Sequence, residues 1–171
     1  MSRVFFASDL HFGHKRIHKF RTQFSGELEH REYVIDKWNS VIGKNDKVFV
    51  LGDAAFTMES MAAIKKLAGN KVLIRGNHDK LNTSVYLWAF QEVYGLIRYK
   101  DCWLSHAPIH PLELRGLFNI HGHVHNETIP DKRYFNACLE NIDYTPVEFS
   151  VIKDQLVMPE DDLDDQFIVK G

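Results

Sequence analysis

Short apolar runs alternate with longer segments of helical periodicity in the first half of the chain. Three of the runs are rich in β-branched or aromatic residues: 4–7, 47–51 and 71–74. They are too short for helices and therefore predict buried strands. Between them, apolar positions recur at helical spacing over 27–42 and over 58–67, where Thr57 is a candidate N-cap. This order predicts a parallel βαβ core with right-handed crossovers.

The second half of the chain is divided into shorter apolar runs joined by turn-like segments. Four of these runs predict further strands: 96–99, 102–104, 118–120 and 134–137. We expect them to form a second sheet. The segment 150–157 fits either a strand pair or a helical turn. Residues 1–158 form one predicted domain, and the acidic segment 159–171 predicts a mobile C-terminal tail.

Composition and charge narrow the class of protein. The 171 residues are 44% hydrophobic and 26% charged, which is ordinary for one globular domain. The 21 Lys and Arg against 23 Asp and Glu give a net charge of −2, which argues against long nucleic acid as a partner. The sequence has no apolar run of membrane-spanning length, and Cys102 and Cys138 fit a reduced compartment. We therefore expect a cytoplasmic protein with no membrane partner.

Polar side chains suited to metal binding and catalysis follow five of the predicted strands. In chain order they are Asp9 and His11, Asp53, Asn77 with His78 and Asp79, His106, and His123 with His125. Ligands of α/β sheets bind beyond the carboxyl ends of the strands, so these distant segments can converge on one site. Glycines at 52, 76 and 122 would let the backbone approach that site closely.

The donor set fits two metal ions. Asp9 and His11 are two positions apart, so both side chains point the same way from an extended backbone. Asp53 is a carboxylate that can bridge two cations. The remaining four candidate ligands are one amide and three imidazoles: Asn77, His106, His123 and His125. Each motif alone is more often structural, but chance does not readily place all of them in order at five strand ends. Oxygen and nitrogen donors without thiolates suit Mn, Fe, Zn, Co or Ni.

These motifs resemble those of the calcineurin-like metallophosphoesterase family, and in particular its small, capless bacterial and phage members. The matching elements are Asp-x-His, Gly-Asp, Gly-Asn-His-Asp, a lone His and Gly-His-x-His, and they span residues 9–125. The resemblance implies the fold class α/β, as a four-layer α/β/β/α sandwich of two facing mixed sheets. The site is then expected at one edge of the sandwich.

The resemblance also implies how the ligands divide between two divalent metals, for which Mn is the first expectation. Asp9, His11 and His125 would hold one ion, and Asp53 would bridge to the other. The second ion would be held by the three remaining ligands: Asn77, His106 and His123. A hydroxide between the two metals would attack the phosphorus in line, so the protein is expected to be a hydrolase.

Further residues are expected to serve the substrate. By the same resemblance, His78 contacts the phosphate and helps to protonate the leaving group, with Asp79 orienting it. The candidates for substrate binding are Asn77, His78, His14 and Arg115. His14 is the first residue of a basic cluster that ends at Arg21. Arg115 lies in a loop between two segments that carry candidate ligands. We expect the aromatic residues Phe12, Phe118 and Tyr134 to pack in the core rather than to stack on a base. We expect His18 and His30 to lie at the surface.

The expected substrate is a small phosphate diester, nucleotide-like in character. The retained His78 acid suits an alkoxide leaving group, and the chain has no broad basic surface for long DNA. A phosphomonoesterase and a dinucleoside polyphosphate hydrolase are the alternatives within the same chemistry. A non-catalytic metal-binding scaffold is a third alternative, and a nuclease would have only the basic cluster in its favour. The oligomeric state does not follow from the sequence.

Overall fold

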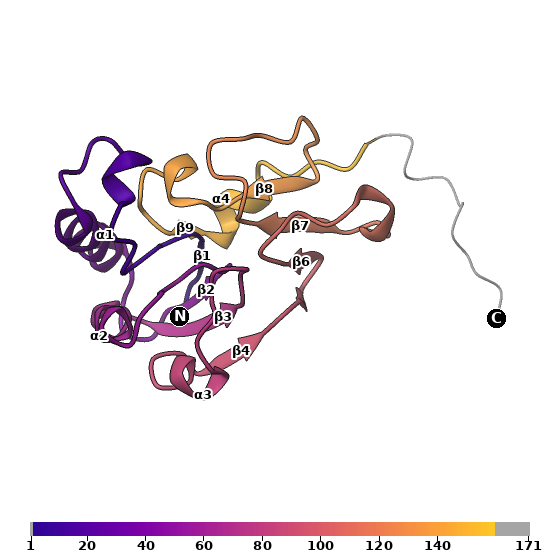
Figure 1. The fold of residues 1–171 in the computed structure, drawn as a ribbon. Helices are drawn as coiled ribbons and strands as arrows, with labels where there is room; N and C mark the ends of the chain where they lie inside the picture. The colour runs from indigo at the N-terminus through magenta and orange to yellow at the C-terminus, as the bar shows by residue number, and fades with distance from the viewer. Residues whose placement is uncertain (1, 160–171) are drawn as a thin grey trace.

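The strands of the protein form two sheets that face each other, as the computed structural model shows for residues 2–159 (Figure 1). Two facing mixed sheets are what the resemblance predicts. All but the first residue of the predicted tail 159–171 lies outside the described part of the chain. Among the described residues, the structure contains no helix that is both long and apolar enough to cross a membrane.

The first sheet has five strands in the order β4-β3-β2-β1-β9. Their bounds are β1 (Val4–Ala7), β2 (Lys47–Val50), β3 (Asn70–Ile74), β4 (Glu92–Tyr94) and β9 (Val147–Glu148). Strands β1 to β4 are parallel, and β9 pairs with β1 in the antiparallel direction. The three strands predicted in the first half are confirmed. Strands β4 and β9 were not predicted, because each is only two or three partly exposed residues without an apolar run.

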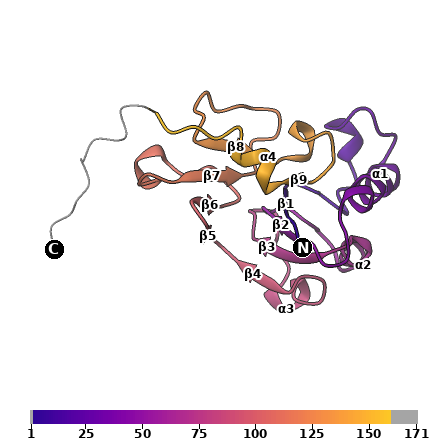
Figure 2. The ribbon, with the colours of Figure 1, turned by 180° about the vertical axis from the view of Figure 1, so that it is seen from behind.

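Helices cover one face of the first sheet. They are α1 (Glu27–Val41), α2 (Met58–Lys66) and the short α3 (Thr83–Tyr86). Trp38 of α1 and Ile64 of α2 are fully buried against Val48 and Val50 of β2. Thr57 caps α2 as predicted, and Ser60 returns the bond to complete a capping box. Seen from behind, α1 and α2 lie on the side of the first sheet that faces away from β6, β7 and β8 (Figure 2).

The second sheet has the order β5-β6-β7-β8 and packs on the other face of the first. Its strands are β5 (Ile97–Tyr99), β6 (Cys102–Leu104), β7 (Phe118–His121) and β8 (Tyr134–Asn136). Only β5 is antiparallel to its neighbour. Side chains alternate along each strand, so Phe6 and Phe49 meet Leu104 and Ile120 between the sheets. All four predicted strands of the second half are confirmed.

Short helical turns complete the fold. They are α4 (Phe149–Lys153), η1 (Ile17–Lys19), η2 (Pro111–Glu113) and η3 (Leu139–Asn141). The segment 150–157 therefore begins as a helical turn. The loop that carries η2 covers the outer face of the second sheet, where Tyr134 Oη donates to the carbonyl of Ile109 at 2.7 Å. Phe12 and Phe118 are buried, so the expectation of core packing is confirmed for both.

Candidate metal centre

The loops that follow β1 and β2 run side by side beyond the carboxyl ends of these strands. The N–H of Asp9 donates to the carbonyl of Gly52 at 3.0 Å, and the N–H of His11 donates to the carbonyl of Asp53 at 2.8 Å. These bonds fix two candidate ligands, Asp9 and His11, next to a third, Asp53. The carboxyl ends of β3, β6 and β7 bring the remaining candidates to the same edge of the molecule.

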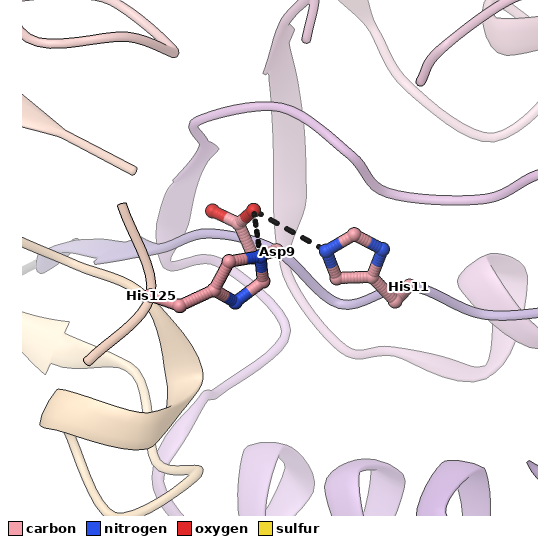
Figure 3. A group of neighbouring side chains, drawn as sticks. All are labelled: Asp9, His11 and His125. Atoms are coloured by element: carbon pink, nitrogen blue, oxygen red, sulfur yellow. Dashed lines mark ion pairs between the residues drawn. The ribbon is translucent and has the colours of Figure 1, made fainter. Parts of the chain in front are cut away.

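Asp9, His11 and His125 form the first group of candidate ligands (Figure 3). Asp9 Oδ1 lies 3.3 Å from His11 Nε2 and 3.8 Å from His125 Nε2. Asp9 Oδ1 and both ring nitrogens of His11 are buried without a hydrogen-bond partner among the described residues. Buried polar atoms are normally satisfied, so these orphaned atoms fit a bound cation.

Asp53 faces both the first group and a second group around His106. Its Oδ2 lies 3.9 Å from His11 Nε2, and its Oδ1 lies 3.6 Å from His106 Nε2. The Nδ1 of His106 is 2.7 Å from the carbonyl of Leu51. A carbonyl can only accept, so Nδ1 carries the proton and the Nε2 lone pair is directed to the site. This geometry suits a carboxylate shared by two cations.

The second group is completed by Asn77 and His123. Asn77 Oδ1 lies 2.9 Å from His106 Nε2, and His123 Nδ1 lies 3.2 Å from the same atom. Both side chains belong to exposed residues, whereas His106 is buried. All seven candidate ligands are thus brought together at a centre that is open to solvent on one side. Their division between two ions stays a prediction.

Five of the seven candidate ligands have a left-handed rather than an extended backbone, so the extended backbone predicted for Asp9 and His11 is wrong. Positive φ values occur at Asp9 (60°), His11 (51°), Asp53 (52°), His123 (74°) and His125 (49°). Non-glycine residues in this region cost about 1–3 kcal/mol each and cluster at functional sites. The side chains of Asp9 and His11 still converge, because the backbone makes a left-handed turn there. His123 and His125 are also two positions apart, but they diverge, because His123 turns to His106 while His125 turns to Asp9.

Three glycines allow the loops to approach the ligands closely, as predicted. An added Cβ at Gly52 would lie 2.3 Å from His106 Nδ1, and one at Gly122 would lie 1.9 Å from Ser8 Oγ. At Gly76 the nearest side-chain oxygen would be 2.2 Å away. Real Cβ atoms essentially never make contacts this short. Any larger residue at these positions would therefore push a ligand or its loop out of place.

The second oxygen of Asp9 is fully engaged by the protein. Its Oδ2 accepts from Ser8 Oγ at 2.6 Å, the N–H of His123 at 2.9 Å and Cys138 Sγ at 3.2 Å. Burial raises the pKa of Asp9, but its interactions with His11, Ser8 and His123 outweigh burial and hold the pKa below its usual range. Burial also raises the pKa of the Cys138 thiol, which therefore donates as a neutral group. Asp9 is thus an oriented carboxylate with Oδ1 left for a cation.

Glu140 and Arg21 support the first group from behind, and the sequence argument missed this role. Glu140 Oε1 lies 3.0 Å from His125 Nδ1 and accepts from Arg21 Nε at 2.9 Å. Arg21 Nη2 donates to the carbonyl of Asp9 at 2.7 Å. Burial raises the pKa of Glu140, but the bonds from His125 and Arg21 lower it to about 2. Arg21 is 2% exposed and so is not part of an exposed basic cluster.

His30 is also buried, which contradicts the surface position expected for it. Its Nε2 lies 2.7 Å from Arg21 Nη1, and its ring packs against Phe12 and Phe24. Burial and the charge of Arg21 lower the pKa of His30 to about 3, so the ring is neutral and accepts the bond. His30 thereby holds Arg21 against the metal centre. The other histidine expected at the surface, His18, is partly buried.

His78 lies at the open side of the centre. Its N–H donates to Asp53 Oδ1 at 2.9 Å, and its ring centroid is 6.0 Å from that of His11. Asp79 is buried, and its carboxylate accepts from three backbone N–H groups: those of Asp53, Ala54 and Gly76. The hydrogen bonds of Asp79 therefore tie two ligand loops together. That Asp79 orients the His78 ring stays a prediction.

The two remaining substrate candidates lie in different surroundings. The ring of His14 is 6.0 Å from that of His11, so it borders the centre. Arg115 is exposed and pairs with Glu113 at 3.2 Å on the loop that carries η2. A role for Arg115 in substrate binding stays a prediction.

Comparison with known proteins relates nearly the whole chain to one family. The sequence model of the family described as calcineurin-like phosphoesterase matches residues 2–168. An uncharacterized protein of Methanocaldococcus jannaschii is 31% identical over 168 residues, which cover 89% of this chain and 90% of that protein. The Gene 66 protein of Mycobacterium phage L5 is 32% identical over 167 residues, which cover 75% of this chain and 80% of the relative.

The fold is shared with a solved structure as well. The crystal structure of a protein of unknown function from Aquifex aeolicus matches with a TM-score of 0.74 and 26% identity. The match covers 91% of this chain and 100% of that one. The α/β sandwich implied by the resemblance is confirmed by this likeness together with the two mixed sheets.

Proposed function

The chain belongs to the calcineurin-like phosphoesterase family, and on this basis we propose that it is a metal-dependent phosphodiesterase of small, nucleotide-like diesters. The observation that carries the proposal is the set of buried, unpartnered donor atoms on Asp9 and His11, with the Asp53 carboxylate facing both ligand groups. Such an arrangement is costly to build without a cation to satisfy it.

The seven candidate ligands fit two divalent cations. Asp9, His11 and His125 would hold one, and Asp53 would face both. The other would be held by the second group: Asn77, His106 and His123. When bound, the two cations would lower the pKa of a water molecule and offset the negative charge of the phosphate. Mn is our first expectation, and the oxygen and nitrogen donors also suit Fe, Zn, Ni or Co.

His78 supplies the proton to the leaving oxygen in this proposal. Its ring is exposed at the open side of the centre, while its backbone N–H is fixed by Asp53. General acid help typically contributes about 10²–10⁴-fold. The His78→Ala variant should keep its metals but lose most turnover of substrates with alkoxide leaving groups. A p-nitrophenolate leaving group needs no proton and should be affected far less. Loss of bound metal in this variant would instead identify His78 as a ligand.

A diester substrate is favoured by the openness of the centre. Asn77, His78 and His123 are all exposed, so organic groups on both sides of a phosphate can extend into solvent. The formal net charge of −2 also provides no strong field to attract long DNA.

The test compares bis-p-nitrophenyl phosphate with p-nitrophenyl phosphate, using purified protein loaded with Mn²⁺. We expect the diester to be preferred, and the Asp53→Asn variant to lose turnover of both compounds. Preference for the monoester would make the protein a phosphomonoesterase. Turnover of a dinucleoside polyphosphate alone would identify it as a hydrolase of that class. A protein with two bound metals and no turnover of any ester would be a binding scaffold.

A further inference from the structure

A row of aromatic rings leads away from the metal centre toward solvent. It begins beside the candidate ligand His11, whose ring meets that of Phe56 edge-on with centroids 5.2 Å apart. The ring of Phe56 lies 5.6 Å from that of His14, and His14 lies 5.6 Å from Phe20. We call Phe56, His14 and Phe20 the aromatic row. It connects the place where the phosphate would bind with a ring well outside it.

The backbone holds the aromatic row in place at both ends. The N–H of Phe56 donates to the carbonyl of Phe12 at 3.0 Å, which attaches this loop to the one that carries His11. At the outer end, the N–H of Phe20 donates to the carbonyl of Ile17 at 2.9 Å and closes η1. These bonds fix the backbone at both ends of the row, so a ligand would have to order only the side chains.

Core packing does not account for this row. Phe20 is 73% exposed, and neither Phe20 nor Phe56 belongs to either hydrophobic cluster of the described residues. One exposed phenylalanine is ordinary on a protein surface. Here, however, Phe20 is continuous with two further rings and, through them, with a metal-ligand candidate. Phe12 and Phe118, in contrast, are buried in the core and offer no face to a substrate.

Resting on the proposed phosphodiesterase function, we propose that the aromatic row binds the organic group of the substrate and selects planar aromatic groups, such as nucleobases, over aliphatic ones. Aromatic side chains stack on any base, because every base has a π-face. The row should therefore distinguish aromatic from aliphatic esters without distinguishing one base from another. Exposed cations on the same turn suit an anionic nucleotide: Lys15, Arg16 and Lys19.

A binding experiment tests the proposal without turnover. Phenylphosphonate and methylphosphonate carry the same anionic group, and their P–C bonds are not phosphate esters. Calorimetry on the Mn²⁺-loaded protein should show tighter binding of phenylphosphonate. Phe20→Ala should weaken phenylphosphonate binding roughly 5- to 20-fold, near the low end for loss of a stacked ring. Methylphosphonate binding should not change, and Phe20→Tyr should retain the preference.

The matched control is Val151→Ala, which truncates another exposed apolar side chain. Val151 is 49% exposed on α4, and α4 lies near Val4, at the opposite end of β1 from Asp9. This variant should bind both phosphonates like the wild type. Equal affinity of the wild type for the two phosphonates would overturn the proposal. If Phe20→Ala weakened the binding of both phosphonates equally, the proposal would also be overturned, because the ring would then not distinguish the two organic groups.

A kinetic comparison separates failure of this inference from failure of the proposed function. Thymidine 5′-p-nitrophenyl phosphate and methyl p-nitrophenyl phosphate share one leaving group and differ in the other ester group. We expect a lower KM for the thymidine ester, and an increase of that KM in Phe20→Ala with little change in kcat. Equal KM values for two esters that are both hydrolysed would refute the aromatic subsite alone. No turnover of either ester would refute the phosphodiesterase as well.

Discussion

His125 is held in place by a carboxylate rather than by a backbone carbonyl. Glu140 binds its Nδ1 and is itself bound by Arg21, which is buried against His30 and the carbonyl of Asp9. Side chains that orient a metal ligand typically change metal affinity or activity 10–100-fold when they are mutated. The charge and the position of Glu140 should therefore both matter to the first group of ligands.

We predict that Glu140→Gln weakens binding of one Mn²⁺ by about 10–100-fold, because His125 loses its charged partner. Titration calorimetry of the metal-free protein measures this directly. Glu113→Gln is the control, since Glu113 is exposed and pairs only with Arg115 among the described residues. Unchanged metal binding in Glu140→Gln would show that His125 does not depend on Glu140.

The neutral, buried His30 leads to a second prediction, which concerns the pH dependence of stability. Its pKa is lowered to about 3 in the folded protein, against 6.5 for the ordinary side chain. Between these values only the unfolded chain binds the proton, so stability falls as the pH decreases from about 6.5 toward 3. This one group contributes up to about 1.4 kcal/mol per pH unit.

His30→Gln should remove that contribution and flatten the pH dependence of stability below about pH 6.5. Gln keeps an acceptor for Arg21, so the fold should be retained. Urea unfolding of the metal-free protein at several pH values gives the slope. His110→Gln, at an exposed position, should leave the slope as it is. An identical slope in His30→Gln and wild type would mean that His30 takes up its proton in both states.

At the scale of elements, the turns after the strands determine the centre more than the strands do. The turn at Gly122 packs directly on Ser8 and Asp9, which follow β1 in the other sheet. We predict that Gly122→Ala displaces these residues, costs about 1–3 kcal/mol of unfolding free energy and weakens metal binding. Chemical unfolding and metal titration measure the two effects.

Gly95→Ala is the matched control for this turn. Gly95 lies between β4 and β5, and a Cβ there would meet nothing within 4 Å. Its stability and metal binding should stay close to wild type. If both variants behaved alike, the close approach at Gly122 would contribute neither to stability nor to metal binding.

The sequence predicts those elements whose apolar pattern is long enough to recognise. It finds β1, β2, β3, the helices α1 and α2 and, from shorter runs, β5 to β8, and it misses β4, β9 and α3, in which no run of apolar residues stands out. The candidate ligands could be found because each follows a strand. The same rule applied to β8 leads to Cys138 and Glu140, so a signal for them was present.

Other features of the metal centre cannot be predicted from the pattern of hydrophobic and polar residues along the sequence. Arg21 stands among charged residues and resembles a solvated position, yet three acceptors hold it inside the protein. The left-handed backbone of Asp9 and His11 is likewise imposed by bonds from the neighbouring loop, at Gly52 and Asp53. Such features depend on long-range contacts, which periodicity does not record.

At the scale of the whole molecule, the centre joins the two sheets. Asp9, His11, Asp53 and Asn77 follow strands of the first sheet, while His106, His123 and His125 follow strands of the second. A cation held by both sets would bind the folded state but not the unfolded one. Metal binding should therefore stabilise the fold as a unit.

We predict a thermal shift on metal loading. Free Mn²⁺ at about 100 times its Kd stabilises the folded state by about 2.7 kcal/mol. For a protein of this size, that corresponds to an increase in Tm of roughly 5–10 °C. Calorimetry with Mn²⁺ and with EDTA measures the shift, and Asp53→Asn should reduce it. An equal Tm in both conditions would show that no cation links the sheets.

The candidate ligands and their support extend from Asp9 to Glu140, which has a consequence for synthesis. A nascent chain on the ribosome cannot assemble the first ligand group together with its support until the segment carrying Glu140 has left the exit tunnel. The metal ion is therefore bound late in synthesis, and chains that stop early would lack part of the set of ligands. The ion would therefore bind copies of the chain that extend past Glu140 and not copies that end before the ligand segments.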